Sequence, residues 1–338
     1  MFMSFDLNSK EIKINSINNK YKIINYIKSY GLNIDKKKNI YLLNFENNQI
    51  VKINKNLKKI TLYSSSDEAI YEDRFINKIF KRKYKNQIID KPHSIEFLDE
   101  IIFLINLGDQ KKNGNITVLN NELKKIKTIK NYFNNKVLKK PAMIFIDKDE
   151  KIYISDTLEN KILIFDKDFN LINWIGSIKN EVDENFKKKN LININLNNPH
   201  GIKKFKQYLI VCDTHNNRVI VIKNNKIYGW FENTSNNQVA FFIRDKKIYK
   251  YFTKIKNLSG PLDMAIYKND IILTESYNGN RLLKINLNEM KISQIDISLN
   301  KNHKLRSSYE IKIVGKYIYV SDPKSKNIKI LSITSLLN

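Results

Sequence analysis

Short apolar runs that end in a polar residue recur along the whole chain. Six of these runs are rich in β-branched and aromatic residues and are bounded by turn residues, which is typical of β-strands. A polar hairpin and a second apolar run follow each of them, so the pattern predicts a repeated antiparallel unit. The six runs are residues 40–44, 101–106, 152–156, 209–213, 271–275 and 317–322.

The prolines mark where each repeated unit begins. The chain contains five prolines, and four of them open the same phrase at a fixed distance before an apolar run. These four are Pro92, Pro141, Pro199 and Pro261. We therefore expect a first strand at each phrase, then the apolar run, a third strand after the hairpin and an outer fourth strand. Four antiparallel strands per unit and six units predict an all-β, six-bladed propeller.

The two ends of the chain predict how the ring closes. The sixth unit stops after its third strand, and residues 23–29 resemble the outer strand 171–177 of another unit. An N-terminal strand that completes the last blade would remove two exposed sheet edges. We expect one domain, 1–338, with a leader 1–20 and a closing strand 21–30. The blades are placed at about 31–63, 91–130, 141–177, 199–231, 260–297 and 308–334, and the inserts at 64–90, 178–198 and 232–259.

The positive charge of the chain suggests nucleic acid as a partner, but the charge is carried mainly by lysine and not by arginine. The net charge is +26, carried by 54 Lys and only 6 Arg in a chain that is also rich in Asn and Ile. Codon drift in an AT-rich genome raises Lys, Asn and Ile together, whereas phosphate and base recognition favours Arg. We therefore favour a small molecule or a protein as the partner and keep nucleic acid as a less favoured alternative.

Hydropathy and cysteine content predict the compartment. No apolar stretch approaches the roughly 18 residues that cross a bilayer, and the first 20 residues lack the continuous apolar region of a secretory signal. Cys212 is the only cysteine, so no disulfide can form within the chain. We expect a cytoplasmic protein with no membrane partner.

The repeated phrases resemble a known blade motif. Residues 199–202 with 212–219, and residues 155–162, are similar to NHL repeats, the blades of six-bladed NHL propellers. The match is strong in blades three and four, fair in blade five, where Glu275 replaces Asp, and weak in the others. The resemblance covers nearly the whole chain as architecture and specifies no reaction.

The topology predicts where a site would lie. The first strand of a blade begins at the same end of the ring as the second strand finishes, and the long inserts join that face. Loops that rim one end of a rigid ring are the expected place for binding. The residue after Pro is predicted at the mouth of the central channel, and the same column read around the ring is Leu32, His93, Ala142, His200, Leu262 and Tyr309. The next position holds Asn33, Ser94, Met143, Gly201, Asp263 and Glu310.

Two of the four histidines share this predicted slot. Imidazole nitrogens that converge on an axis beside carboxylates are the ligands that zinc and similar ions require. The Pro-His phrases resemble those of peptidylglycine amidating lyase, and the slot resembles the ion site of gluconolactonase and strictosidine-synthase propellers. The resemblance implies His93 and His200 as ligands of zinc or calcium, with Asp213 and Asn106 as supporting polar residues. Since Ala142, Leu262 and Tyr309 fill other slots, Glu310 or Asp263 would complete the coordination sphere.

Three functions stay open at this point. The first is a binding scaffold that holds a ligand or partner at the mouth, with Asn33, Asn106, Asp213, Asp263, Tyr309 and Glu310 as candidate contacts. The second is a metal-dependent lyase or lactone hydrolase that uses His93 and His200. The third is RNA binding through the insert 64–90, where a capping box at 65–68 and helical spacing precede the basic residues 81–85.

The regularity of the strand ends favours a structural role for many polar residues. An acidic or amide residue ends every second strand, and the hairpins carry pairs such as Asn160-Lys161 and Asn217-Arg218. A feature that recurs in each blade is not expected to form one active site. We expect these side chains to tie the hairpins to their own or neighbouring blades by satisfying turn amides.

Overall fold

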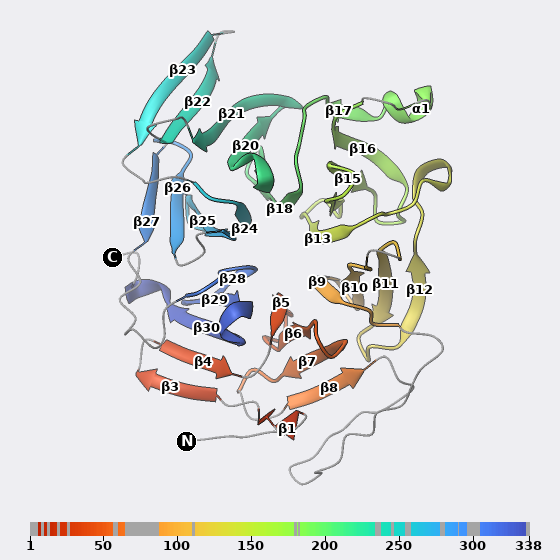
Figure 1. Ribbon diagram of the computed structural model, residues 1–338, viewed down its shortest axis with the longest axis vertical. Helices are drawn as coiled ribbons and strands as arrows, with labels where there is room; N and C mark the ends of the chain where they lie inside the picture. The colour runs from red at the N-terminus through yellow and green to blue at the C-terminus, as the bar shows by residue number, and fades with distance from the viewer. Residues whose placement is uncertain are drawn as a thin grey trace.

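The computed structural model is a six-bladed β-propeller, as the sequence predicts. Six twisted sheets surround a central axis, and the first strand of each sheet lies closest to that axis (Figure 1). The structure describes residues 6–335 apart from 8–9, 12–13, 19–20, 26–27, 57–59, 65–87, 110–111, 179–180, 182, 234–237, 245–246, 254–257, 278–280, 290 and 296–304. The predicted helix and basic residues of the insert 64–90 fall outside the described residues, except at its two ends.

Three blades consist of four strands that are antiparallel and consecutive in the chain. Blade one is β5 (Ser29–Ile34), β6 (Ile40–Asn44), β7 (Gln49–Ile53) and β8 (Ile60–Ser64). Blade two is β9 (Pro92–Leu98), β10 (Ile101–Asn106), β11 (Asn115–Asn120) and β12 (Lys125–Ile129). Blade five is β24 (Pro261–Tyr267), β25 (Asp270–Glu275), β26 (Leu282–Asn286) and β27 (Lys291–Ile295).

Blades three and four are larger because inserts join their sheets. Blade three is β13 (Pro141–Ile146), β14 (Ile152–Asp156), β15 (Lys161–Phe165), β16 (Leu171–Gly176) and β17 (Asn190–Ile192), the last parallel to β16. A helical turn, α1 (Glu184–Lys187), precedes β17. Blade four is β18 (Pro199–Phe205), β19 (Tyr208–Asp213), β20 (Arg218–Lys223), β21 (Lys226–Asn233), β22 (Gln238–Arg244) and β23 (Lys247–Thr253). The region predicted as an insert at 232–259 therefore contributes two strands to blade four.

The N-terminal segment closes the ring, as predicted. Blade six holds β28 (Ile311–Val314), β29 (Tyr317–Asp322) and β30 (Asn327–Ser332), and β4 (Tyr21–Asn25) pairs antiparallel with β30. A fifth strand, β3 (Ile14–Asn18), lies outside β4, and β1 (Asp6–Leu7) pairs with β2 (Lys10–Glu11). The register differs from the sequence alignment, because Ile24 and not Ile27 occupies the position of Ile175.

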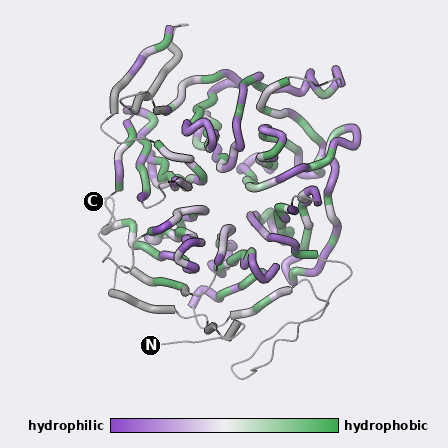
Figure 2. The backbone as a smooth tube through the Cα atoms, in the orientation of Figure 1, coloured by the Kyte–Doolittle hydropathy of each residue, from purple (hydrophilic) through white to green (hydrophobic). Residues whose placement is uncertain are grey.

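The hydrophobic core is divided among the junctions between blades. Alternate residues of a strand face opposite blades, so in β10 Phe103 and Ile105 pack towards blade three while Ile102 and Leu104 pack towards blade one. Apolar segments accordingly run through the sheets, and hydrophilic residues gather on many of the connecting loops (Figure 2). Among the described residues, no helix is long and apolar enough to cross a membrane.

The polar ends of the second strands fasten the loop that leads into each blade. Asp156 accepts the backbone N–H groups of Lys139 and Lys140, each at 2.8 Å, and equivalent bonds occur in other blades. Hairpin asparagines with positive φ bind the following blade, since Asn160 accepts from the N–H of Asn198 at 2.7 Å. These contacts confirm the structural role predicted for the recurrent polar residues. The second-strand ends that accept loop N–H groups are Asn106, Asp156, Asp213, Glu275 and Asp322.

Candidate functional site at the channel mouth

Strand register defines which residues share the slot at the channel mouth. A β-bulge lies near the start of the first strand of blades one to five. The reference pair of each blade is the one made by the residue two before the end of the second strand, and it joins Ile202 to Val211 in blade four and Leu32 to Leu42 in blade one. The slot lies two residues before the first-strand member of this pair, so blade one contributes Tyr30 and not Leu32. The mouth ring is therefore Tyr30, His93, Ala142, His200, Leu262 and Tyr309.

Four aromatic or imidazole rings of the mouth ring contact one another around the axis. The ring of Tyr30 stacks on that of His93, with 5.7 Å between centroids, and lies 4.9 Å from the ring of Tyr309. The centroid of His200 lies 6.4 Å from His93 and 6.3 Å from Tyr309. Side chains from blades one, two, four and six therefore meet at one place, and the expected convergence of His93, His200 and Tyr309 is confirmed.

The hydrogen bonds of His93 fix its tautomer. Its Nδ1 lies 2.7 Å from the carbonyl oxygen of Ala142, which can only accept, so Nδ1 carries the proton. In the neutral ring Nε2 is then an acceptor, and the hydroxyl of Tyr309 donates to it at 2.9 Å. Burial lowers the pKa of His93 to about 4 and keeps this imidazole neutral at pH 7.

His200 has a similar anchor but leaves one nitrogen available. Its Nδ1 donates to the carbonyl oxygen of Asn198 at 3.0 Å and lies 3.3 Å from the hydroxyl of Thr214. That hydroxyl donates to the carbonyl of Pro261, so its oxygen is able to accept from His200. Among the described residues, Nε2 of His200 has no hydrogen-bond partner. Burial, and next the neighbouring His93, lower the pKa of His200 to about 3.

The buried His93 is expected to make stability depend on pH. An unfolded histidine has a pKa near 6.5, so the unfolded chain binds a proton that the native state excludes as pH falls from 6.5 towards 4. Stability is therefore present above pH 6.5 and is lost below it, by up to about 3 kcal/mol at pH 4 from this one group. Urea unfolding across this range should show a shallower decline for His93→Gln. A His215→Asn control, which removes an exposed imidazole, should keep the wild-type slope; equal slopes in all three proteins would contradict the prediction.

The acids predicted beside the histidines bind backbone groups just below the mouth. Asp263 accepts from the N–H of Ile311 at 3.0 Å, and its other oxygen, Oδ1, is buried without a partner. Glu310 accepts from the hydroxyl of Ser94 at 3.0 Å and from the N–H of Leu32. Burial raises the pKa of Glu310 to about 8. Both acids join the first strand of their own blade to that of another blade.

The remaining predicted contacts lie elsewhere. Asn33 follows the bulge and binds the carbonyl of Ile95 and the carboxylate of Glu96, at 2.7 and 2.8 Å, deeper in the channel. Asn106 and Asp213 hold the loops that lead into blades two and four. Sequence reasoning missed Tyr30, because blade one has no Pro to mark the slot. The pairing of the apolar run 40–44 with the strand before it would have been the signal.

The donor set at the mouth does not fit a zinc site with three protein ligands. The two Nε2 atoms are suitable donors, but the nitrogen of His93 already accepts the Tyr309 hydroxyl. The described part of the chain holds no group of three or more His, Cys, Asp or Glu side chains arranged to hold a metal ion. An ion held by His93 and His200 alone stays a prediction.

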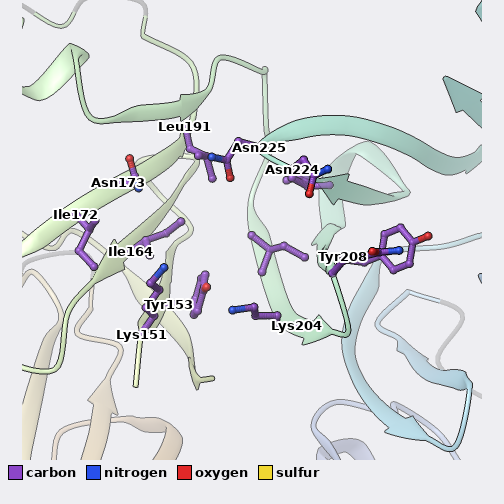
Figure 3. A pocket seen from close by; sticks show the side chains of 13 residues that line it. Lys151, Tyr153, Ile164, Ile172, Asn173, Leu191, Lys204, Tyr208, Asn224 and Asn225 are labelled. Atoms are coloured by element: carbon purple, nitrogen blue, oxygen red, sulfur yellow. The ribbon is translucent and has the colours of Figure 1, made fainter. Parts of the chain in front are cut away.

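Cavities open at both ends of the propeller. One, of about 780 Å³, lies at the mouth end between the hairpin of blade three and its neighbouring loops, and is lined by Lys139, Glu159, Lys161 and Glu181 among others. At the opposite end, about 200 Å³ is enclosed between blades three and four around Tyr153, Lys204 and Tyr208 (Figure 3). A further cavity of about 350 Å³ lies between blades one and six. The first is of the size that small-molecule ligands occupy.

Comparison with known proteins supports the fold at low sequence identity. No protein-family model matches the chain, and no curated protein is significantly similar to it. A structure of virginiamycin B lyase from Staphylococcus aureus is similar over 93% of this chain and 99% of its own, with a TM-score of 0.57 and 14% identity. A catalytically inactive histidine-to-alanine variant of that lyase with quinupristin is similar over the same shares, with a TM-score of 0.53 and 13% identity.

The structural likeness extends to a protein assembly of a different kind. A chain of a mitotic checkpoint complex is similar over 98% of both chains, with a TM-score of 0.54 and 10% identity. At such identities the likeness concerns architecture alone, because unrelated functions share one fold. The chain is thus a six-bladed β-propeller whose fold is similar to that of streptogramin B lyases.

Proposed function

We propose that this propeller binds a small molecule at the channel mouth, in contact with Tyr30, His200 and Tyr309. The observation that carries the proposal is the meeting of four rings from four blades, with Nε2 of His200 left as an acceptor that no described residue pairs with. Tyr30, His200 and Tyr309 are partly exposed, so a ligand can reach them, whereas His93 is 3% exposed and supports them from below.

The chemistry of the mouth limits the ligand. Both imidazoles are neutral at pH 7, so this ring offers no positive charge to an anion. Tyrosine rings favour flat apolar or aromatic groups, and the free Nε2 accepts from an N–H or O–H donor. We infer a neutral ligand that carries an aromatic group and a hydrogen-bond donor. A larger ligand would extend over the rim into the 780 Å³ cavity of the same end.

The test compares wild-type protein with His200→Ala, using phenol and indole as probes in ligand-observed NMR. Both probes should bind the wild type, and His200→Ala should weaken binding about tenfold, the effect of one lost hydrogen bond together with lost packing. His215→Ala, a change at an exposed hairpin histidine, should bind as the wild type does. Equal binding by all three proteins, or no binding by any, would refute the mouth as the site.

A second candidate is a lyase in which His200 accepts a proton from the substrate. The specific support is the fold shared with a lyase whose histidine-to-alanine variant is described as catalytically inactive. In such an elimination a proton moves from carbon to Nε2, its bonding electrons form a double bond, and the bond to the leaving group breaks. The low pKa of His200 makes it a weak base, which is why we place binding first.

Quinupristin serves as the probe for this second candidate, and mass spectrometry separates the reactions. Elimination within a cyclic ester leaves the mass unchanged, whereas hydrolysis by a lactone hydrolase adds one water. Conversion by the wild type and none by His200→Ala would support catalysis.

Metal analysis of the wild type and of a His93→Ala/His200→Ala variant tests the two-histidine ion site. Equal, near-zero metal content in both proteins would exclude that site. Nucleic-acid binding through residues 81–85 stays a prediction, because that segment is outside the described residues.

A further inference from the structure

A second ring of polar side chains lines the channel below the mouth. In each first strand, the residue that follows the pair made by the residue two before the second-strand end is Asn33, Glu96, Phe145, Lys203, Ala265 or Lys312. Lys312 lies 3.8 Å from Glu96, although blade one stands between their blades. Lys203 occupies the same position on the first strand of blade four, and the charge of Lys312 acts on its pKa. These side chains therefore meet across the axis. We call them the lower ring.

The acids near the lower ring are engaged with the channel wall. One oxygen of Glu96 accepts from the amide of Asn33 at 2.8 Å and from the N–H of Phe97 at 3.3 Å. Glu310 and Asp263, closer to the mouth, accept backbone N–H groups as described above. The partnerless oxygen of Asp263 lies against Gly201, where an added Cβ would approach it to 3.3 Å.

The two lysines lack matching acceptors. Lys312 has one carboxylate within 4.0 Å, that of Glu96, and Lys203 has none among the described residues. The Nζ of Lys203 lies 4.7 Å from the centre of the Phe145 ring, and the residue is 9% exposed. A buried ammonium group without an acceptor is costly, since water no longer solvates it. The lower ring therefore carries two amines, and among the described residues only one carboxylate lies within 4.0 Å of either of them.

We propose that the lower ring is a binding site for a small oxyanion, a carboxylate or a phosphate, held between the Nζ atoms of Lys203 and Lys312. An oxyanion supplies the acceptor that Lys203 lacks and screens the two ammonium groups from each other. The side chains of Glu96 and Lys312 are 17% and 12% exposed, so water reaches this level. Phe145 forms an apolar wall beside Lys203. The site is separate from the channel mouth and does not depend on the function proposed for it.

Proton uptake distinguishes this site from ordinary surface attraction. Burial, and next the charge of Lys312, lower the pKa of Lys203. Burial also acts to lower the pKa of Lys312, but the nearby acids outweigh it, so the pKa of Lys312 is raised. These acids are Glu96, Glu310 and Asp263. Without an anion, Lys203 is thus the amine that loses its proton more readily. A bound anion favours the charged form and restores that proton. Binding should consequently be accompanied by uptake of protons in the pH range where Lys203 titrates.

The experiment is isothermal titration of wild-type protein with acetate and, separately, with inorganic phosphate. Saturable binding is expected for at least one of them, and whichever binds more tightly identifies the oxyanion class. For acetate, the heat measured at successive pH values below the ordinary lysine pKa, in buffers of different ionisation enthalpy, should reveal net proton uptake. Lys203→Met and Lys312→Met should each weaken binding at least tenfold, and Lys206→Met, at the neighbouring hairpin, should not. Absence of saturable binding, or equal binding in all variants, would overturn the proposal.

A measurement on unaltered protein covers the case in which a variant does not fold. Brief acetylation of the wild type, followed by peptide mass spectrometry, reports the reactivity of individual lysines. A saturating amount of the bound anion should protect Lys203 several-fold and leave Lys206 unprotected. Equal modification of Lys203 with and without the anion would refute the site.

Discussion

Deletion of residues 1–28 is expected to abolish cooperative folding. The deletion removes β4, whose residues Ile23 and Ile24 are 4% and 0% exposed, and leaves the edge of β30 without its partner. Ile24 packs in the core between blades one and six with Leu32, Ile328 and others. Burial of two isoleucines stabilises by about 2–3 kcal/mol each, and the lost strand hydrogen bonds add about 1 kcal/mol apiece. The total approaches the whole stability of a typical domain, about 5–15 kcal/mol.

The matched control is a shorter deletion. Removal of residues 1–12 eliminates β1 and β2, which pair only with each other among the described strands, and should leave the thermal unfolding temperature nearly unchanged. Calorimetry and near-ultraviolet circular dichroism of both deletions test the prediction. If the protein that lacks residues 1–28 unfolded at the wild-type temperature, β4 would not be the element that closes the ring.

Asp213→Ala is expected to destabilise the protein by about 3–5 kcal/mol, the usual cost of removing one partner of a buried ion pair. The carboxylate is fully buried and accepts from Nε of Arg218 at 2.7 Å, from the N–H of Asn197 at 2.7 Å and from the amide of Asn216 at 2.9 Å. Alanine leaves these donors without their acceptor in the loop that positions His200. Weaker ligand binding at the mouth should therefore accompany the lost stability.

Urea unfolding measures this cost, and an exposed acid gives the comparison. Asp149 pairs with Lys204 at the surface, where ion pairs contribute little, and Lys204 keeps a second partner in Asp147. Asp149→Ala should leave the unfolding midpoint within experimental error of the wild type. A similar small change for Asp213→Ala would mean that its network does not hold the loop.

The regular parts of the propeller could be predicted because each blade repeats the same local pattern. The second strands of blades one, two, three and six match their predicted bounds, and those of blades four and five begin one residue earlier. The slot that holds His93, His200 and Tyr309 was predicted from the position after proline, read as one column around the ring. Apolar alternation and a fixed spacing from proline specify position along a strand, so they were sufficient here.

The parts that could not be predicted depend on breaks in that pattern or on contacts across the axis. No proline marks the bulge in β5. The predicted mouth column therefore contains Leu32 at blade one, whereas the strand pairing assigns that position to Tyr30. The bond from Tyr309 to His93 joins blades two apart, which only the curvature of the ring determines. The lower ring was not predicted because its side chains, such as Lys203, lie one residue beyond the repeated phrases that begin with proline.

The outermost strand of blade four has a consequence for self-association. β23 lies at the free end of its sheet and projects from the ring (Figure 1), with exposed Ile248 and Tyr249 between Lys247 and Lys250. An unpaired edge with apolar side chains is a template on which a second polypeptide could add a strand, and in time a fibril. The two flanking lysines, on a molecule of charge +26, make the approach of another copy repulsive. We therefore expect the positive charge at this edge to disfavour pairing with a second copy of the chain.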